Sequence, residues 1–343
     1  MTSKISLKSI ACFLLIFSSA VAVSMAQSTA QPATQSAPRN HNVRVVSFCF
    51  KQGTQSLDAM CKLIDAEGAK GVDLVCLPEE WSGHDPEPMD GPTVTAMAKL
   101  AKQYHTYIVC PLQTKRGGFN YNTSVLIDRN GKVAGFYDKA FPYWSEFDGP
   151  NPAHPSQGDA SVFETDFGRV GMAICFDAKF PEVFQRLRHQ GADLVVWSSA
   201  YSGYTELQSY ATLFHYYIIS STWAGDCLAY DLTGHNLLDQ NDHKGLTIAH
   251  ITLDMDRQIY HYNFNQAKLK KLLAEHGNDV TVDADLPREE WFVLKAKRPD
   301  VSARQLGQQY GLEPLLDYFH RSREHINDLR GFEFAQKYGG DPE

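Results

Sequence analysis

The chain has 343 residues, of which 43% are hydrophobic and 21% are charged, and its formal net charge is -8 at pH 7. This composition predicts a folded protein with a substantial core, in one large or two ordinary domains. It argues against a disordered chain. It also lacks the basic excess that nucleic-acid-binding proteins usually carry, so we expect no nucleic-acid partner.

The first 41 residues differ from the rest of the chain. An apolar run at residues 10–23 follows two lysines, and Ser24 and Ala26 are small residues at the positions that a signal peptidase reads. The run is shorter than the roughly 20 residues of a membrane span. We therefore expect residues 1–26 to be a cleaved signal peptide and residues 27–41 to be a flexible linker. The mature protein is then expected to be exported, periplasmic or secreted, without stable membrane insertion.

From residue 42 onward, apolar strands alternate with helices, and several strands are apolar throughout, which is typical of α/β proteins with buried sheets. Strands are expected at 43–50, 72–77, 107–112, 122–128, 132–137, 161–165, 169–174, 192–197, 227–231 and 247–254, and helices at 56–69, 93–104, 181–189 and 206–218. We expect residues 42–278 to form one domain. Residues 279–343 are charged and show no strand pattern, which predicts a helical C-terminal extension.

Six cysteines lie outside the expected signal peptide. Cys49, Cys76 and Cys110 stand inside apolar runs, where a free cysteine packs as a small hydrophobic residue. The sequence leaves open one disulfide among the five cysteines other than Cys175. No CxxC pair, HExxH motif, phosphate-binding loop or GxGxxG motif is present, so we expect no metal and no cofactor.

Three polar residues each follow an apolar strand. Glu79 follows LVCLP, Lys139 follows GFYD, and Cys175 follows RVGMAI. Strand ends at a sheet edge are where α/β folds place their sites. A thiol, a carboxylate and an ammonium suffice for acyl transfer through a thioester. Taken singly, each has an ordinary reading, since a cysteine in a strand is most often core packing and a lysine is most often solvated.

The segments around these residues resemble those of one known family. LVCLPEEW at 74–81, the stretch from YNTS to YWSE at 121–146, and the stretch at 157–200 that contains GMAICFD are similar to the glutamate, lysine and cysteine segments of the carbon–nitrogen hydrolase (nitrilase) superfamily, in its amidase and carbamoylase branch. The resemblance runs from about residue 42 to residue 254. It implies a four-layer α-β-β-α sandwich with two central mixed sheets, followed here by the helical extension.

The resemblance also implies roles for the site residues. Cys175 would be the nucleophile, and Glu79 the general base that takes the thiol proton and passes it to the leaving amine. Lys139 would stabilise the oxyanion, and the backbone N–H of Phe176 would be a second donor. On this basis we expect Lys139→Ala to abolish turnover while leaving folding largely intact.

Three further residues are expected around this set. Glu146 matches the family's second glutamate and would hold Lys139 and help to position substrate or water. Trp81 and Tyr143 are expected pocket walls, although aromatic residues there are more often plain packing.

The implied function is hydrolysis of a small amide or N-carbamoyl compound, with water as the second substrate, through a cysteine thioester. Nitrile hydrolysis is the alternative, and Phe176-Asp177 after the cysteine, where nitrilases often carry Trp and Glu, favours amide chemistry. A catalytically inactive binding or scaffold protein is a third possibility. Relatives commonly associate through the helical face that follows the nucleophile, so a homodimer or larger homo-oligomer is expected.

Overall fold

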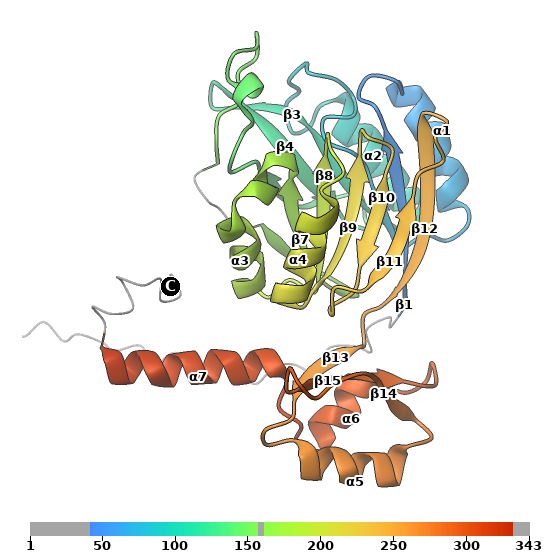
Figure 1. Ribbon diagram of the computed structural model, residues 1–343. Helices are drawn as coiled ribbons and strands as arrows, with labels where there is room; N and C mark the ends of the chain where they lie inside the picture. The colour runs from blue at the N-terminus through green and yellow to red at the C-terminus, as the bar shows by residue number, and fades with distance from the viewer. Residues whose placement is uncertain (1–41, 157–160, 332–343) are drawn as a thin grey trace, which may run out of the picture. The chain divides into compact units, whose positions relative to one another are not determined.

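The computed structural model describes residues 42–156 and 161–331. The expected signal peptide and linker lie outside the described residues. Two six-stranded mixed sheets dominate the fold (Figure 1). The first has the order β12 (Leu246–Asp254), β1 (Asn42–Phe50), β2 (Leu74–Cys76), β3 (Tyr107–Arg116), β4 (Phe119–Ile127), β5 (Val133–Asp138), and the second has the order β11 (Asn236–Gln240), β10 (Cys227–Tyr230), β9 (Tyr217–Thr222), β8 (Leu194–Ser199), β7 (Gly168–Ile174), β6 (Val162–Thr165).

Helices cover the outer face of each sheet. α1 (Leu57–Gly68) and α2 (Pro92–Tyr104) pack on the first sheet through a cluster that includes Met60 and Met97. α3 (Pro181–His189) and α4 (Tyr204–Phe214) pack on the second sheet through Phe184 and Leu207. A third apolar cluster fills the space between the two sheets. The four-layer α-β-β-α sandwich that the sequence predicted is therefore confirmed.

Local sequence signals explain where several helices begin. The Ser56 hydroxyl caps α1 by accepting a hydrogen bond of 3.2 Å from the Ala59 N–H. Prolines occupy the first positions of α2 and α3, where a missing N–H costs nothing. The observed bounds of α3 are those predicted from the sequence.

The helix predicted at 206–218 is too long. α4 ends at Phe214 because His215 adopts a left-handed conformation with φ of 55°. The residues that follow form β9, a strand in the interior of the second sheet that the sequence analysis missed.

Because neighbouring strands run parallel, their carboxyl ends lie at the same edge of each sheet. β1, β2 and β3 run parallel in the first sheet, and β7, β8 and β9 run parallel in the second. The Ser198 hydroxyl, near the end of β8, donates a hydrogen bond of 2.9 Å to the Leu77 carbonyl just past β2. The carboxyl ends of strands from both sheets therefore meet at one edge, where residues that follow these strands come together.

The C-terminal part, residues 258–331, contains helices as predicted and also strands that were not predicted. Its helices are α5 (Gln266–His276), α6 (Ala303–Gln309) and α7 (Leu315–Arg330). Two short 3-10 helices, η1 (Trp144–Glu146) and η2 (Cys175–Lys179), belong to the sandwich and not to this part. It also contains an antiparallel sheet in the order β13 (Gln258–His261), β15 (Trp291–Ala296), β14 (Val280–Leu286). The expectation that no strand follows residue 279 is therefore wrong. β14 alternates apolar and polar residues over only seven positions, a weak signal within a charged stretch.

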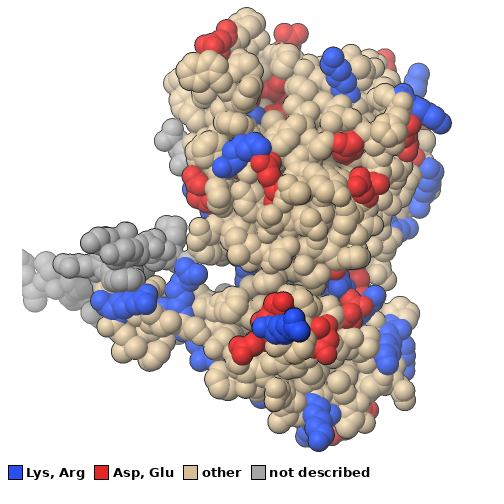
Figure 2. All heavy atoms as spheres, in the orientation of Figure 1, with Lys and Arg blue, Asp and Glu red and all other residues tan. Residues whose placement is uncertain are grey.

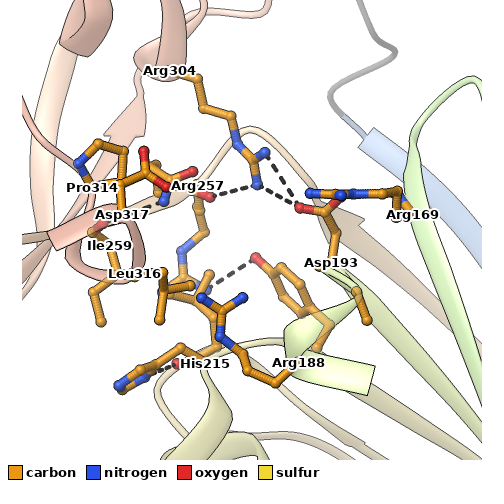
Figure 3. A pocket seen from close by; sticks show the side chains of 15 residues that line it. Arg169, Arg188, Asp193, His215, Arg257, Ile259, Arg304, Pro314, Leu316 and Asp317 are labelled. Carbon is orange, nitrogen blue, oxygen red and sulfur yellow. Dashed lines mark hydrogen bonds and ion pairs between the residues drawn. The ribbon is translucent and has the colours of Figure 1, made fainter. Parts of the chain in front are cut away.

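Four further observations concern the described residues. Their six cysteines are all free thiols. No helix among residues 42–156 and 161–331 is long and apolar enough to span a membrane. On the face drawn in Figure 2, basic and acidic side chains are interspersed. A small cavity rich in arginine lies between the second sheet and the C-terminal part (Figure 3).

Candidate active site

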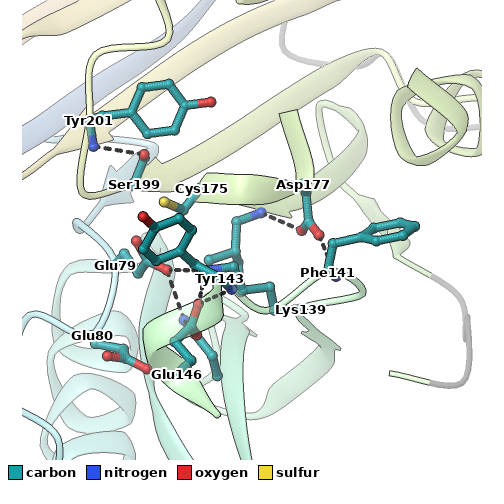
Figure 4. Close-up of polar contacts among 12 residues, drawn as sticks. Glu79, Glu80, Lys139, Phe141, Tyr143, Glu146, Cys175, Asp177, Ser199 and Tyr201 are labelled. Carbon is teal, nitrogen blue, oxygen red and sulfur yellow. Dashed lines mark hydrogen bonds and ion pairs between the residues drawn. The ribbon is translucent and has the colours of Figure 1, made fainter. Parts of the chain in front are cut away.

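Glu79 lies three residues past the end of β2 and is almost completely buried. Its Oε1 accepts hydrogen bonds of 2.8 Å from the Lys139 ammonium and 2.8 Å from the Asn122 side-chain amide (Figure 4). Both bonds go to the same oxygen. Among the described residues, Oε2 is therefore the oxygen open to another donor.

Lys139 follows β5, and only 1% of its surface is exposed. Its ammonium lies between two carboxylates, 2.8 Å from Glu79 and 2.6 Å from Glu146. The Asn122 amide also donates to Glu146, at 3.0 Å, so it bridges the same two carboxylates. One ammonium and one amide thus hold two glutamates that would otherwise repel each other in a buried space.

Cys175 is the first residue after β7, at the start of η2. Its φ of 45° is unusual for a residue with a side chain, and such strain is often found at functional turns. The Trp197 indole N–H donates to the Cys175 carbonyl at 3.2 Å and holds this turn. Figure 4 shows the sulfur of Cys175 on the side of Glu79 and Lys139.

The surroundings of Cys175 favour a protonated thiol at rest. Burial raises its pKa to about 12, and the charge of Glu79 adds to this. The Lys139 charge, the Ser199 hydroxyl and the Ala200 N–H act in the opposite direction. Because a thiol is a poor nucleophile, such a cysteine needs a base at the moment of attack.

The two charged neighbours have shifted pKa values as well. Burial raises the pKa of Glu79, the Lys139 charge opposes this, and the charges of Glu80 and Glu146 add to it. Burial disfavours the Lys139 ammonium, but the negative charges of Glu79 and Glu146 and the hydrogen bond with Glu146 outweigh that effect and raise its pKa. A carboxylate with a raised pKa is a better proton acceptor, and the ammonium stays charged beside it.

Asp177 connects the turn of Cys175 to the loop of Lys139. Its carboxylate is fully buried and accepts from the Ile174 N–H at 2.9 Å, the Phe141 N–H at 3.0 Å and the Tyr137 hydroxyl at 2.8 Å. Burial raises its pKa to about 6. Through these bonds, Asp177 fixes the distance between the two segments that carry the thiol and the ammonium.

The two aromatic residues expected as pocket walls, Tyr143 and Trp81, differ in their exposure. Tyr143 is 51% exposed, and its ring meets the ring of Phe176 edge to face, with centroids 5.2 Å apart. Its backbone N–H donates to Glu146 at 2.6 Å. Trp81 is fully buried in the apolar cluster between the first sheet and its helices. The expectation that Trp81 is a pocket wall is corrected accordingly, since its side chain packs the core.

Sequence reasoning did not identify three residues that complete this arrangement: Asn122, Asp177 and Ser199. Each is buried and polar: Asn122 lies within β4, Asp177 lies three residues past β7, and Ser199 is the last residue of β8. A polar residue within or close to an apolar strand was a usable signal, because a polar side chain is seldom buried without a partner. Among residues 42–156 and 161–331, no cluster of three or more His, Cys, Asp or Glu is placed to hold a metal ion.

Comparison with known proteins gives the following similarities. The family model described as carbon-nitrogen hydrolase matches residues 33–260. A deaminated glutathione amidase of Synechocystis is 27% identical over 246 residues, which cover 60% of this chain and 89% of that protein. An N-carbamoylputrescine amidase of Solanum lycopersicum is 23% identical over 295 residues, which cover 77% and 95%. Nit3 of Saccharomyces cerevisiae, a member of branch 10 of the nitrilase superfamily, superposes with a TM-score of 0.56 at 19% identity, covering 68% of this chain and 97% of Nit3.

Proposed function

Because this chain belongs to the carbon–nitrogen hydrolase family, we propose that it hydrolyses a small non-peptide amide or N-carbamoyl compound through a thioester on Cys175. The observation that carries the proposal is the buried cluster in which Lys139 bridges Glu79 and Glu146 beside Cys175. A buried, charged cluster of this kind is costly to maintain for stability alone.

The proposed reaction begins at the Cys175 thiol. As its sulfur attacks the carbonyl carbon, the proton passes to the open Oε2 of Glu79 and the carbonyl oxygen becomes an oxyanion. Lys139 and the Phe176 N–H stabilise that oxyanion. Collapse of the intermediate breaks the C–N bond, and Glu79 returns the proton to the leaving ammonia or amine.

The second half of the reaction uses water. Glu79 takes a proton from the water molecule as its oxygen attacks the thioester carbonyl. The C–S bond then breaks, Glu79 returns the proton to the sulfur, and the acid is released. The raised pKa of Cys175 supports this order of proton transfers. A cysteine that is a neutral thiol at rest is expected to leave the thioester as a neutral thiol too, with the proton supplied by Glu79.

The choice of an amide or carbamoyl substrate rests on two observations. Two relatives, which match over 246 and 295 residues, are named as an amidase and an N-carbamoyl amidase. Phe176-Asp177 follows the nucleophile, where nitrilases often have Trp and Glu. The buried Asp177 carboxylate serves three hydrogen bonds that orient this turn.

A substrate panel tests the proposal. The mature protein is incubated with small amides, N-carbamoyl amino acids and nitriles, and ammonia release is measured with Cys175→Ala and Cys61→Ser as paired variants. We expect release from an amide or carbamoyl compound, lost in Cys175→Ala and kept in Cys61→Ser. Ammonia release from nitriles alone would show that the substrate is a nitrile and not an amide. No ammonia release from any of the three classes would favour a binding protein without activity.

Export and self-association are separate proposals. We propose that residues 1–26 are removed on export, which N-terminal sequencing of the protein from the periplasm or medium tests.

We also propose a homodimer or larger homo-oligomer formed through the face of α3 and α4, where Tyr204 and Leu213 of α4 are 48% and 66% exposed. Light scattering of wild type and Leu213→Lys tests this, because a charge at the interface should favour monomers.

A further inference from the structure

A cavity of about 180 Å³ lies at the edge of the second sheet opposite the candidate active site. One wall is formed by the chain at the amino ends of the parallel strands, including Arg169 of β7 and Tyr217 of β9. The other wall comes from β13 and from the first turns of α6 and α7. Cys175 follows the opposite, carboxyl end of β7, so the cavity is a separate place in the fold.

Four arginines line this cavity, and one of them is neutralised by neighbours. Arg257 forms ion pairs of 2.7 Å with Asp231 and 2.7 Å with Asp283. Lys295 lies 3.8 Å from the same Asp283, so these two cations and two carboxylates balance. Arg257 therefore contributes little net charge to the space inside.

Three further arginines line the cavity, Arg169, Arg188 and Arg304, together with the carboxylates of Asp193 and Asp317. Arg169 also lies 3.9 Å from Glu164, outside the cavity. Arg304 lies 3.4 Å from Asp193, the long end of the hydrogen-bond range. His215 also lines the cavity, but burial lowers its pKa, so it adds no charge near neutral pH.

Arg188 differs from Arg257 in its neighbours. It comes from α3 and is only partly exposed, and it forms no hydrogen bond or ion pair with another described residue. Figure 3 shows its guanidinium directed into the space between Arg257 and Asp193. Burial lowers its pKa to about 10, although the charges of Asp193 and Asp317 oppose this. A charged group in such a position is stabilised by a bound counterion.

We propose that this cavity is a second binding site, which holds a small oxyanion, a carboxylate or a phosphate group, on Arg188 with Arg169 and Arg304. A planar guanidinium binds both kinds of anion through paired hydrogen bonds. The ligand contacts residues of the sandwich and of α6 at once, so binding stabilises the packing of the C-terminal part against the second sheet.

Isothermal titration of the full chain with two probes tests the site. Inorganic phosphate and acetate are titrated separately into protein in phosphate-free buffer, with chloride keeping the ionic strength constant. We expect saturable binding of one anion per chain, and the probe that binds identifies the source of the oxyanion. Arg188→Gln should weaken that binding about tenfold or more, as loss of a charge-assisted hydrogen-bond pair does.

Arg323→Gln is the matched control, because Arg323 is exposed on α7 and the substitution changes the net charge equally. It should bind the anion as wild type does. If Arg188→Gln does not fold, Arg304→Gln takes its place. The proposal is overturned if neither probe shows saturable binding, or if the Arg188 and Arg323 variants bind equally well.

Discussion

The Tyr137 hydroxyl donates a hydrogen bond of 2.8 Å to Oδ2 of Asp177. Tyr137 lies near the end of β5 in the first sheet, and Asp177 lies in the segment that follows β7 in the second. The same hydroxyl accepts from the Ala140 N–H at 3.1 Å. Lys139 precedes Ala140, and Cys175 precedes Asp177 by two residues. One side chain thus ties the loop of the ammonium to the turn of the thiol.

Tyr137→Phe removes both of these hydrogen bonds while keeping the ring. We expect the free energy of unfolding to fall by about 1–3 kcal/mol, because Asp177 and the Ala140 N–H lose a buried partner. We also expect kcat to fall about tenfold with little change in KM, since the lysine and cysteine segments are less well oriented. Urea unfolding and steady-state kinetics measure the two effects. Tyr318→Phe, on α7, is the control and should change neither quantity.

Asp177 should also give the stability a pH dependence. Its pKa is about 6 in the folded protein and near 3.8 in the unfolded chain. The folded state therefore binds the proton more tightly, so this contribution is fully present below pH 3.8 and is lost as the pH rises through 6. The total change is about 3 kcal/mol. Melting temperatures of wild type and Asp177→Asn between pH 4 and 7 test this, and parallel curves would contradict it.

The burial of Lys139 changes what its removal should do. The sequence suggested that Lys139→Ala leaves folding largely intact, but this ammonium is the partner of two buried carboxylates. We now expect Lys139→Met to lower kcat by about 10²–10³-fold and the unfolding free energy by about 3–5 kcal/mol. Adding Glu146→Gln should restore part of the stability and none of the activity. Strictly additive stability losses in the double variant would rule out this coupling.

Ser199 should control the reactivity of the nucleophile. Its hydroxyl, with the Ala200 N–H, opposes the rise in the pKa of Cys175. Ser199→Ala should therefore raise that pKa further and slow alkylation by iodoacetamide several-fold between pH 7 and 9. The rates are followed by mass spectrometry in a Cys61→Ser background, because Cys61 is the partly exposed thiol among the described cysteines. Equal rates with and without Ser199 would disprove the role.

The sequence predicted the parts of this molecule that depend on local pattern. Apolar strands with Glu79 or Cys175 close past their ends could be recognised in the sequence, and so could a helix that begins with Pro181. It could not predict contacts between distant segments, such as Tyr137 with Asp177, which depend on how the two sheets face each other. β9 was not predicted because the apolar spacing of α4 continues past His215, and a histidine by itself does not predict a left-handed residue that ends a helix. Arg188 gave no signal, since only the fold reveals that no residue within 42–156 and 161–331 forms a hydrogen bond or ion pair with it.

The covalent state of Cys175 during turnover tests the central claim most directly. The protein is mixed with a substrate found in the panel, quenched within the first turnovers, digested and analysed by mass spectrometry. The account predicts the mass of the acyl group on the peptide that contains Cys175, no such mass on the Cys61 peptide, and no turnover in Cys175→Ala. Sustained turnover by Cys175→Ala, with every cysteine unmodified in the wild-type protein, would contradict it.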